Sequence, residues 1–257
     1  MSLVPRAVHY VGYVDFQKVF TVSGNATILG VTGLVDFYQF NFTIFPQDVL
    51  YEVDIQLLDQ DTAVTLLKLQ SDTLNVLELS FARATNVPSW TVGSYAIRQL
   101  LMRTPNQQSP GRGYLSLADG YAVISVDAQT GRDQVKTVLA QIAYGMSSLF
   151  DNSTIQTAVY ASGITAGPYI ALFLGMFSSQ LNGSEMIVKS ISSGSGPSNA
   201  ISVTRSVLFR DQDTALSRYG EAERIYRDAS SYAVLDSWLV MNYQYSTDQL
   251  RTEIRGI

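Results

Sequence analysis

The chain has 257 residues, no cysteine, a single histidine (His9) and a net charge of −5, and charged residues make up only 15 % of it. Structural zinc sites take four Cys or His ligands and disulfides take two cysteines, so this composition excludes both. A Ser-His-Asp triad would have to use His9, and no cluster of Lys and Arg could neutralise several phosphates. We expect no cofactor and no nucleic-acid partner, and the composition leans away from an enzyme.

The hydrophobic content of 46 % and the length are enough for a sizeable core. We expect a single α+β domain over residues 1–257. A subdivision into a β-rich region, 1–90, and a mixed α/β region, 91–257, with a helical C-terminal part, is also open.

The first third of the chain is rich in β-branched and aromatic residues, interrupted by Gly and Pro, and this pattern predicts strands. The strands expected are 8–14, 19–22, 26–31, 34–44 and 49–57. In the last of them Glu52 and Asp54 alternate with apolar residues and share one face. Two neighbouring carboxylates can act as acid and base or hold a cation. A solvated strand face is the interpretation that we prefer.

The middle of the chain mixes both kinds of element. Segments 73–81 and 114–126 are predicted as strands, the second as a hairpin that turns at Asp119-Gly120. Segment 91–103 has helical spacing. Segment 131–150 is the clearest helix, with Thr130 placed to cap it and an apolar stripe along one face. The stretch 105–113 is predicted as a flexible loop.

The last third is predicted to contain strands at 155–161, 186–191 and 201–209, a buried helix at 166–177, helices over 214–242 and a tail helix at 247–255. A loop rich in Ser and Gly, 192–199, separates two of these strands. The apolar part of 166–177 is only about a dozen residues long, whereas a membrane span needs about twenty. We therefore expect no transmembrane segment.

One short motif occurs twice, as Asp59-Gln60-Asp61-Thr62-Ala63 and as Asp211-Gln212-Asp213-Thr214-Ala215. The preferred interpretation makes Asp61 and Asp213 the N-caps of two helices, because a carboxylate accepts hydrogen bonds from free amides there. The chemical alternative is a metal site: Asp59 with Asp61, or Asp211 with Asp213, could hold Mg²⁺ or Mn²⁺ beside a phosphate. An internal duplication is a third and weaker interpretation, because the flanking sequences do not match.

Composition also bears on function. The basic residues are thirteen Arg and four Lys, beside fifteen Tyr and eleven Phe, and interface cores are enriched in Arg and Tyr and depleted in Lys. The sequence therefore favours a self-assembling structural protein, such as a viral capsid, turret or accessory coat component, whose partners are further copies of itself and other structural proteins. Two alternatives stay open: a metal-dependent transferase or hydrolase that uses the Asp-x-Asp carboxylates, and a receptor- or host-binding module. The sequence leaves the location open: with no signal-peptide core it is not obviously that of a secreted protein, and the structural interpretation implies a virion or intracellular location.

Overall fold

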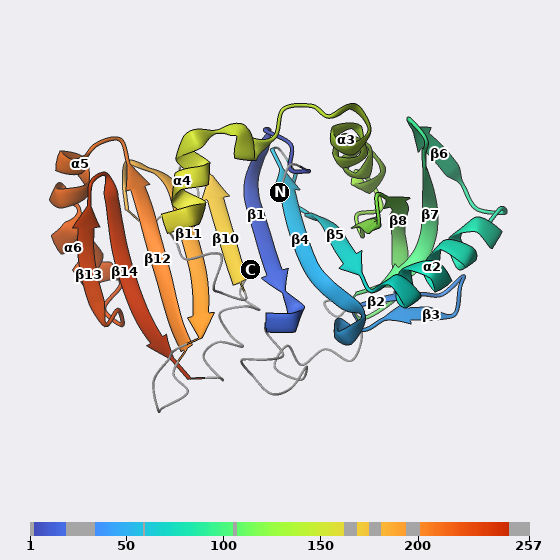
Figure 1. Cartoon of the computed structure of the whole chain (residues 1–257), viewed down its shortest axis with the longest axis horizontal. Coiled ribbons are helices and arrows are strands. Elements are labelled where there is room, and N and C mark those ends of the chain that lie inside the picture. The colour runs from blue at the N-terminus through green and yellow to red at the C-terminus, as the bar shows by residue number, and fades with distance from the viewer. Residues whose placement is uncertain are drawn as a thin grey trace.

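One curled antiparallel sheet organises the molecule (Figure 1). The computed structural model describes residues 3–18, 34–58, 60–104, 107–161, 169–174, 181–193 and 201–246. Of these residues, 45 % lie in strands and 28 % in helices. The strands are β1 (Val8–Asp15), β2 (Val35–Phe37), β3 (Phe42–Ile44), β4 (Val49–Leu57), β5 (Val64–Leu69), β6 (Ser89–Val92), β7 (Tyr95–Arg103), β8 (Gly111–Ala118), β9 (Tyr121–Ser125), β10 (Tyr169–Leu174), β11 (Ser184–Ser193), β12 (Ile201–Phe209), β13 (Ser231–Leu235) and β14 (Trp238–Tyr245).

The helices are few and mostly short. They are α2 (Ser71–Arg83), α3 (Gly131–Tyr144), α4 (Ser153–Ala161), α5 (Gln212–Ser217) and α6 (Tyr219–Ile225), with 3₁₀ turns at Pro46–Asp48 and Leu149–Asp151. None of the helices in the described ranges is both long and apolar enough to cross a membrane.

The strand order is β13-β14-β12-β11-β10-β1-β4-β5-β9-β8-β7-β2-β3, and β6 pairs with the first part of β7. Most neighbours are consecutive in the chain. The exception that joins the two halves is β1, which pairs with β4 on one side and with the much later β10 on the other. The sheet therefore ends in β13 at one extreme and in the short strands β3 and β6 at the other.

Each face of the sheet carries its own hydrophobic core, because successive side chains of a strand point to opposite faces. One core, here called core A, contains Phe37, Leu100 and Tyr243, and helices α2, α5 and α6 pack on it through Leu77, Ala215 and Ala222. The other, core B, is covered by α3 and α4 and includes Ile55, Val123 and Val188 with Val135, Val138 and Leu139 of α3 and Ile155 of α4. The sheet is thus a central layer between two sets of helices.

The expected fold class, α+β with a helical C-terminal part, is wrong. The described chain is mostly β, and its C-terminal region ends in the β13–β14 hairpin. Helices α5 and α6 fill only the first part of the region predicted as helical, 214–242. The proposed tail helix, 247–255, lies outside the described residues, as do the predicted strands 19–22 and 26–31 and most of the loop 192–199.

Four other predicted elements have the opposite secondary structure. Segment 73–81 is part of helix α2, and segment 91–103 belongs to the β6–β7 hairpin. Segment 155–161 is part of helix α4, and the described part of 166–177 is strand β10. The predicted strand 34–44 is a hairpin, β2 and β3, that turns at Asn41 with φ +48°.

The strongest local signals are confirmed. Strands β1, β4, β11 and β12 occupy the predicted positions, and β8 and β9 form the predicted hairpin through Asp119 and Gly120, both with positive φ. Helix α3 begins at Gly131 as expected, but it ends at Tyr144 and not at 150, because the C-cap Gly145 has φ +58° and stops the helix in the left-handed conformation.

Candidate interaction face

The first Asp-Gln-Asp motif connects the sheet to helix α3. Asp59 lies outside the described residues, and Asp61 is exposed just before strand β5, so the interpretation of Asp61 as a helix N-cap is wrong. Its neighbours carry the contact instead. The buried Gln134 amide of α3 donates to Thr62 Oγ1 (2.9 Å) and to Gln60 Oε1 (3.2 Å). Gln134 Oε1 accepts a hydrogen bond from the Ser125 hydroxyl (2.8 Å).

Asp127 completes this connection and holds the start of α3. Its carboxylate accepts hydrogen bonds from the amides of Gln129 (2.7 Å) and Thr130 (2.9 Å), and from the Thr62 hydroxyl (3.0 Å). These bonds, led by that from the Thr130 amide, lower the pKa of Asp127. Thr130 occupies the cap position predicted for it, but its side chain does not cap the helix; its hydroxyl donates to Asp127 (2.8 Å).

The second motif is a helix cap through its first aspartate. Asp211, rather than Asp213, is the N-cap of α5, and its carboxylate accepts from the Thr214 amide (2.8 Å) and hydroxyl (2.6 Å). The Thr214 hydroxyl, the Thr214 amide and then Arg210 lower the pKa of Asp211 to about 2. Asp213 is exposed in the first turn, where its charge suits the helix dipole.

The two motifs do not share a site, because β5 and β12 are separated by four strands of the sheet. Across the described ranges no three Asp, Glu or His side chains gather as metal ligands would. The metal hypothesis for Asp59, Asp61, Asp211 and Asp213 therefore has no shared geometry behind it and stays a prediction from sequence.

Glu52 and Asp54 do share a face of β4, as predicted, but it is the face of core A and not a solvated one. Both side chains are partly buried, and the Thr65 hydroxyl donates to Asp54 Oδ1 (2.5 Å). Desolvation, then the charge and hydrogen bond of Asp54, raise the pKa of Glu52 well above its usual value. Desolvation also raises the pKa of Asp54. Such a pair can share a proton.

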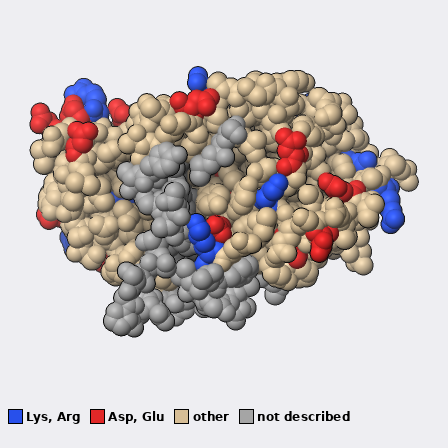
Figure 2. All heavy atoms as spheres, viewed as in Figure 1, with Lys and Arg blue, Asp and Glu red and all other residues tan. Residues whose placement is uncertain are grey.

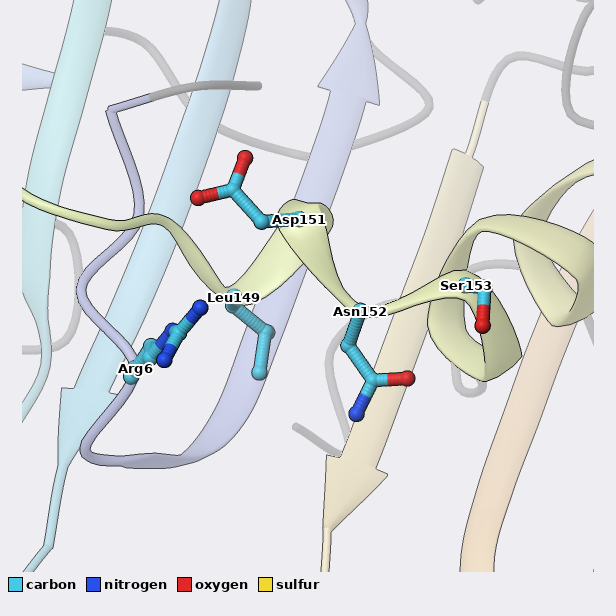
Figure 3. Close-up of a pocket in the computed structure, with 5 residues that line it drawn as sticks. All are labelled: Arg6, Leu149, Asp151, Asn152 and Ser153. Atoms are coloured by element: carbon cyan, nitrogen blue, oxygen red, sulfur yellow. The ribbon is translucent and has the colours of Figure 1, made fainter.

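A hollow of about 480 Å³ lies where the N-terminal segment meets the turn before α4, lined by Arg6, Leu149, Asp151, Asn152 and Ser153 (Figure 3). Its polar groups serve the local backbone: Asp151 accepts from the Ser148 amide (2.7 Å) and Asn152 from the Thr154 amide (2.9 Å). In Figure 3 the Asp151 carboxylate and the Asn152 amide point to opposite sides. These groups do not converge on one ligand position.

The strands at the C-terminal end of the sheet present a different kind of surface. On the core B side, β12, β14 and β13 expose one continuous face, here called the terminal face. Its apolar half contains Ala233, Leu235, Trp238 and Val240, which lie side by side in the register of β13 and β14. Leu235 is 61 % exposed and the other three are partly exposed.

The other half of the terminal face is a ladder of hydroxyl and amide side chains across the same strands. Thr204 Oγ1 donates to Asn242 Oδ1 (2.9 Å), and Asn242 Nδ2 donates to Ser231 Oγ (3.1 Å). One step further along, Gln244 Nε2 donates to Ser202 Oγ (2.9 Å). The ladder joins three strands without a charged group.

The terminal face is almost free of charge. Strands β12, β13 and β14 contain a single charged residue, Arg205, which lies on the core A side with its guanidinium 5.0 Å from the Tyr226 ring and 5.7 Å from the Tyr243 ring. In Figure 2 the surface over β13 and β14, at the left, is mostly uncharged, with charged side chains gathered near its upper end. This arrangement supplies contact area and neutral hydrogen-bonding groups, not acid–base chemistry.

None of the terminal-face residues was predicted as a site. A signal existed in β12, where Ser202, Thr204 and Ser206 alternate with Val203, Arg205 and Val207, and in β14, where Asn242 and Gln244 alternate with Met241, Tyr243 and Tyr245. The alternation in β14 was not recognised, because most of that strand fell within the region predicted as helical, 214–242.

The fold is similar to that of TP0453. Three crystal forms of that protein match with TM-scores of 0.56, 0.55 and 0.53, at 10 %, 9 % and 8 % sequence identity. The alignments cover 100 %, 99 % and 98 % of this chain and 97 %, 96 % and 95 % of the TP0453 chains. At this identity the similarity shows the fold alone. No protein-family model and no curated protein sequence matches the chain.

Proposed function

We propose that this protein is a self-assembling structural protein whose terminal face supplies the contact between copies. The observation that carries the proposal is the continuity of an uncharged, partly apolar face with the edge strand β13, which pairs only with β14 among the described residues. Exposed apolar area of this kind marks interaction surfaces, and charge depletion is typical of interface cores. The finer expectation, a capsid, turret or coat component, belongs to the same proposal because such shells repeat one contact by symmetry.

The opposite end of the sheet supports this assignment by contrast. There the edge strands β3 and β6 have three and four residues, and the Arg103–Asp36 ion pair (2.8 Å) lies beside β3 on the β7–β2 junction. Short strands and nearby charges are the usual protection of a sheet edge against association. The end at β13 has neither charge nor proline in its five residues.

The test compares two equally exposed leucines. Leu235 on the terminal face is 61 % exposed, and Leu79 on the outer side of α2 is 59 % exposed. Light scattering coupled to size exclusion, over a concentration series, should show a defined oligomer for the wild type. The variant Leu235→Lys should dissociate it, because each buried leucine contributes about 1.5–3 kcal/mol. The control Leu79→Lys should leave the mass unchanged.

Two results would overturn the proposal. One is a wild-type chain that stays monomeric at the highest concentration. The other is an oligomer that Leu79→Lys dissociates and Leu235→Lys does not, which would move the contact to α2.

A further inference from the structure

The free edge of β13 has a defined hydrogen-bonding pattern. Strands β13 and β14 are joined by the two-residue loop Asp236-Ser237, so the flanking pair Leu235 and Trp238 is hydrogen-bonded. In an antiparallel pair such positions alternate, so Ala233 and Ser231 also bond toward β14. The amide and carbonyl groups of Tyr232 and Val234 therefore point away from the sheet. Within the described residues no further backbone hydrogen bond reaches either one.

We infer that two copies of the chain pair through this edge, β13 antiparallel to β13, about a two-fold axis at Ala233. The inference rests on the proposed assembly and names its contact. In this register Tyr232 faces the partner's Val234, and Val234 faces the partner's Tyr232. Because each of these residues offers one amide and one carbonyl, the pairing forms four hydrogen bonds.

Side-chain chemistry selects a second copy as the occupant. On the core A side the register puts Tyr232 against the partner's Val234, an aromatic and β-branched pair of the kind that stabilises sheets. On the terminal face the two small Ala233 side chains meet at the axis. Leu235 lies opposite the partner's Ser231 and diagonal to the partner's Ala233. An uncharged strand thus meets an identical uncharged strand, and the contact closes as a dimer.

Other registers use less of the edge. An axis at Tyr232 places Val234 opposite the partner's Ser230, which precedes the strand. An axis at Val234 places Tyr232 opposite the partner's Asp236, which follows the strand. Only the axis at Ala233 pairs all five residues, 231–235, with residues of the partner strand. The register therefore predicts which residues face each other, and crosslinking of single cysteine variants can test it.

The experiment uses the absence of native cysteine. In the proposed register the two Ala233 residues form a non-hydrogen-bonded pair, whose Cα atoms lie about 4.5 Å apart. That separation falls within the range that a disulfide spans. Under mild oxidation the variant Ala233→Cys should therefore convert to a covalent dimer, seen on a non-reducing gel and by mass spectrometry. Leu79→Cys, at an exposed position on α2 away from the terminal face, should stay monomeric on that gel.

A mixing experiment fixes the register. Ser231→Cys mixed with Leu235→Cys should give the crosslinked heterodimer, since these positions face each other. Crosslinking of Ser231→Cys with Ala233→Cys instead would place the axis at Tyr232. Crosslinking of Ala233→Cys with Leu235→Cys would place it at Val234. Either result overturns the inferred register.

The outcomes separate the two proposals. An oligomer by light scattering whose Ala233→Cys variant does not crosslink, although circular dichroism shows it folded, leaves the assembly standing and removes the β13 contact. A monomeric wild type would contradict both the proposed assembly and the β13 contact. As a second measurement, Ala233→Lys should raise the dimer dissociation constant at least tenfold, while Leu79→Lys on α2 should not.

Discussion

At the scale of single residues, the carboxyl pair on β4 makes the stability of the fold depend on pH. The pKa of Glu52 is raised in the folded state, so folding favours its protonated form. This contribution to the free energy of unfolding is fully present below the ordinary value of 4.5 and is lost as the pH rises through the raised pKa. The protein is therefore less stable at neutral pH than an isosteric neutral pair would be.

We expect Glu52→Gln to raise the free energy of unfolding at pH 8 by about 1 kcal/mol or more, because one pKa unit corresponds to 1.4 kcal/mol. The difference from wild type should shrink as the pH falls to 4. Urea denaturation at both pH values measures it. Glu78→Gln, on the exposed side of α2, is the control and should have the wild-type pH profile. Equal profiles for Glu52→Gln and wild type would contradict the prediction.

Asp127 acts in the opposite sense, because its hydrogen bonds to the start of α3 lower its pKa. Its contribution is present at neutral pH and is lost as the pH falls through the lowered pKa. Asp127→Ala should cost about 2 kcal/mol at pH 7, the usual value for hydrogen bonds to a charged group. Chemical denaturation measures the loss. Asp72→Ala, at an exposed position in the first turn of α2, should cost far less.

At the scale of elements, local sequence predicted the structure where a turn signal, a run of β-branched residues or a regular apolar stripe marked the element. Asp119-Gly120 specified the β8–β9 hairpin, and the apolar stripe of α3 specified a helix. Segment 73–81 of helix α2 was wrongly predicted as a strand, because its apolar residues do not form one helical stripe. Val76 and Leu79 are exposed while Leu77 is buried, so apolar residues lie on both sides of α2. Pairing with β8 makes 95–103 a strand, and that contact is not visible in the local sequence.

The start of α3 gives a test at the element scale. A Cβ atom on Gly131 would lie 2.6 Å from Ser125 Oγ and 2.9 Å from Tyr114 Cδ2, so Gly131→Ala should cost about 1–3 kcal/mol through overpacking. Gly220 of α6 has no atom within 4 Å of such a Cβ. Gly220→Ala, in the first turn of α6, should therefore be neutral or stabilise by up to about 1 kcal/mol, because alanine has the higher helix propensity. Thermal unfolding of both variants measures the contrast, and equal losses would contradict it.

The terminal face could not be predicted, because its hairpin lacks a clear turn signal and its strands pair with distant parts of the chain. The β13–β14 hairpin turns at Asp236-Ser237 with Asp236 at φ +54°, and it lacks the glycine that marks the β8–β9 turn. The helical prediction for 214–242 also extended past Ser231, where strand β13 begins. The charge-poor composition of the face was visible in sequence, but its position at a sheet edge depends on pairing between distant strands.

At the scale of the whole molecule, the proposed contact is neutral, and this determines its response to salt. Interfaces held by exposed ion pairs weaken as ionic strength screens the charges. An interface of backbone hydrogen bonds and apolar side chains has no such dependence. The oligomer mass should therefore be the same at 50 mM and 1 M NaCl, measured by light scattering. Dissociation at high salt would point to a charged interface elsewhere on the molecule.

The position of β1 in the middle of the sheet has a consequence for how the chain folds during synthesis. Tyr10 lies opposite Gln56 on one side and opposite Phe173 on the other, so one side of β1 can pair early and the other must wait for most of the chain. Contacts of such long sequence separation form slowly. Until β10 emerges from the ribosome, the nascent chain exposes an unpaired edge at β1 that is absent from the finished sheet. During that interval the backbone amides and carbonyls along this edge of β1 are open to pairing with other chains.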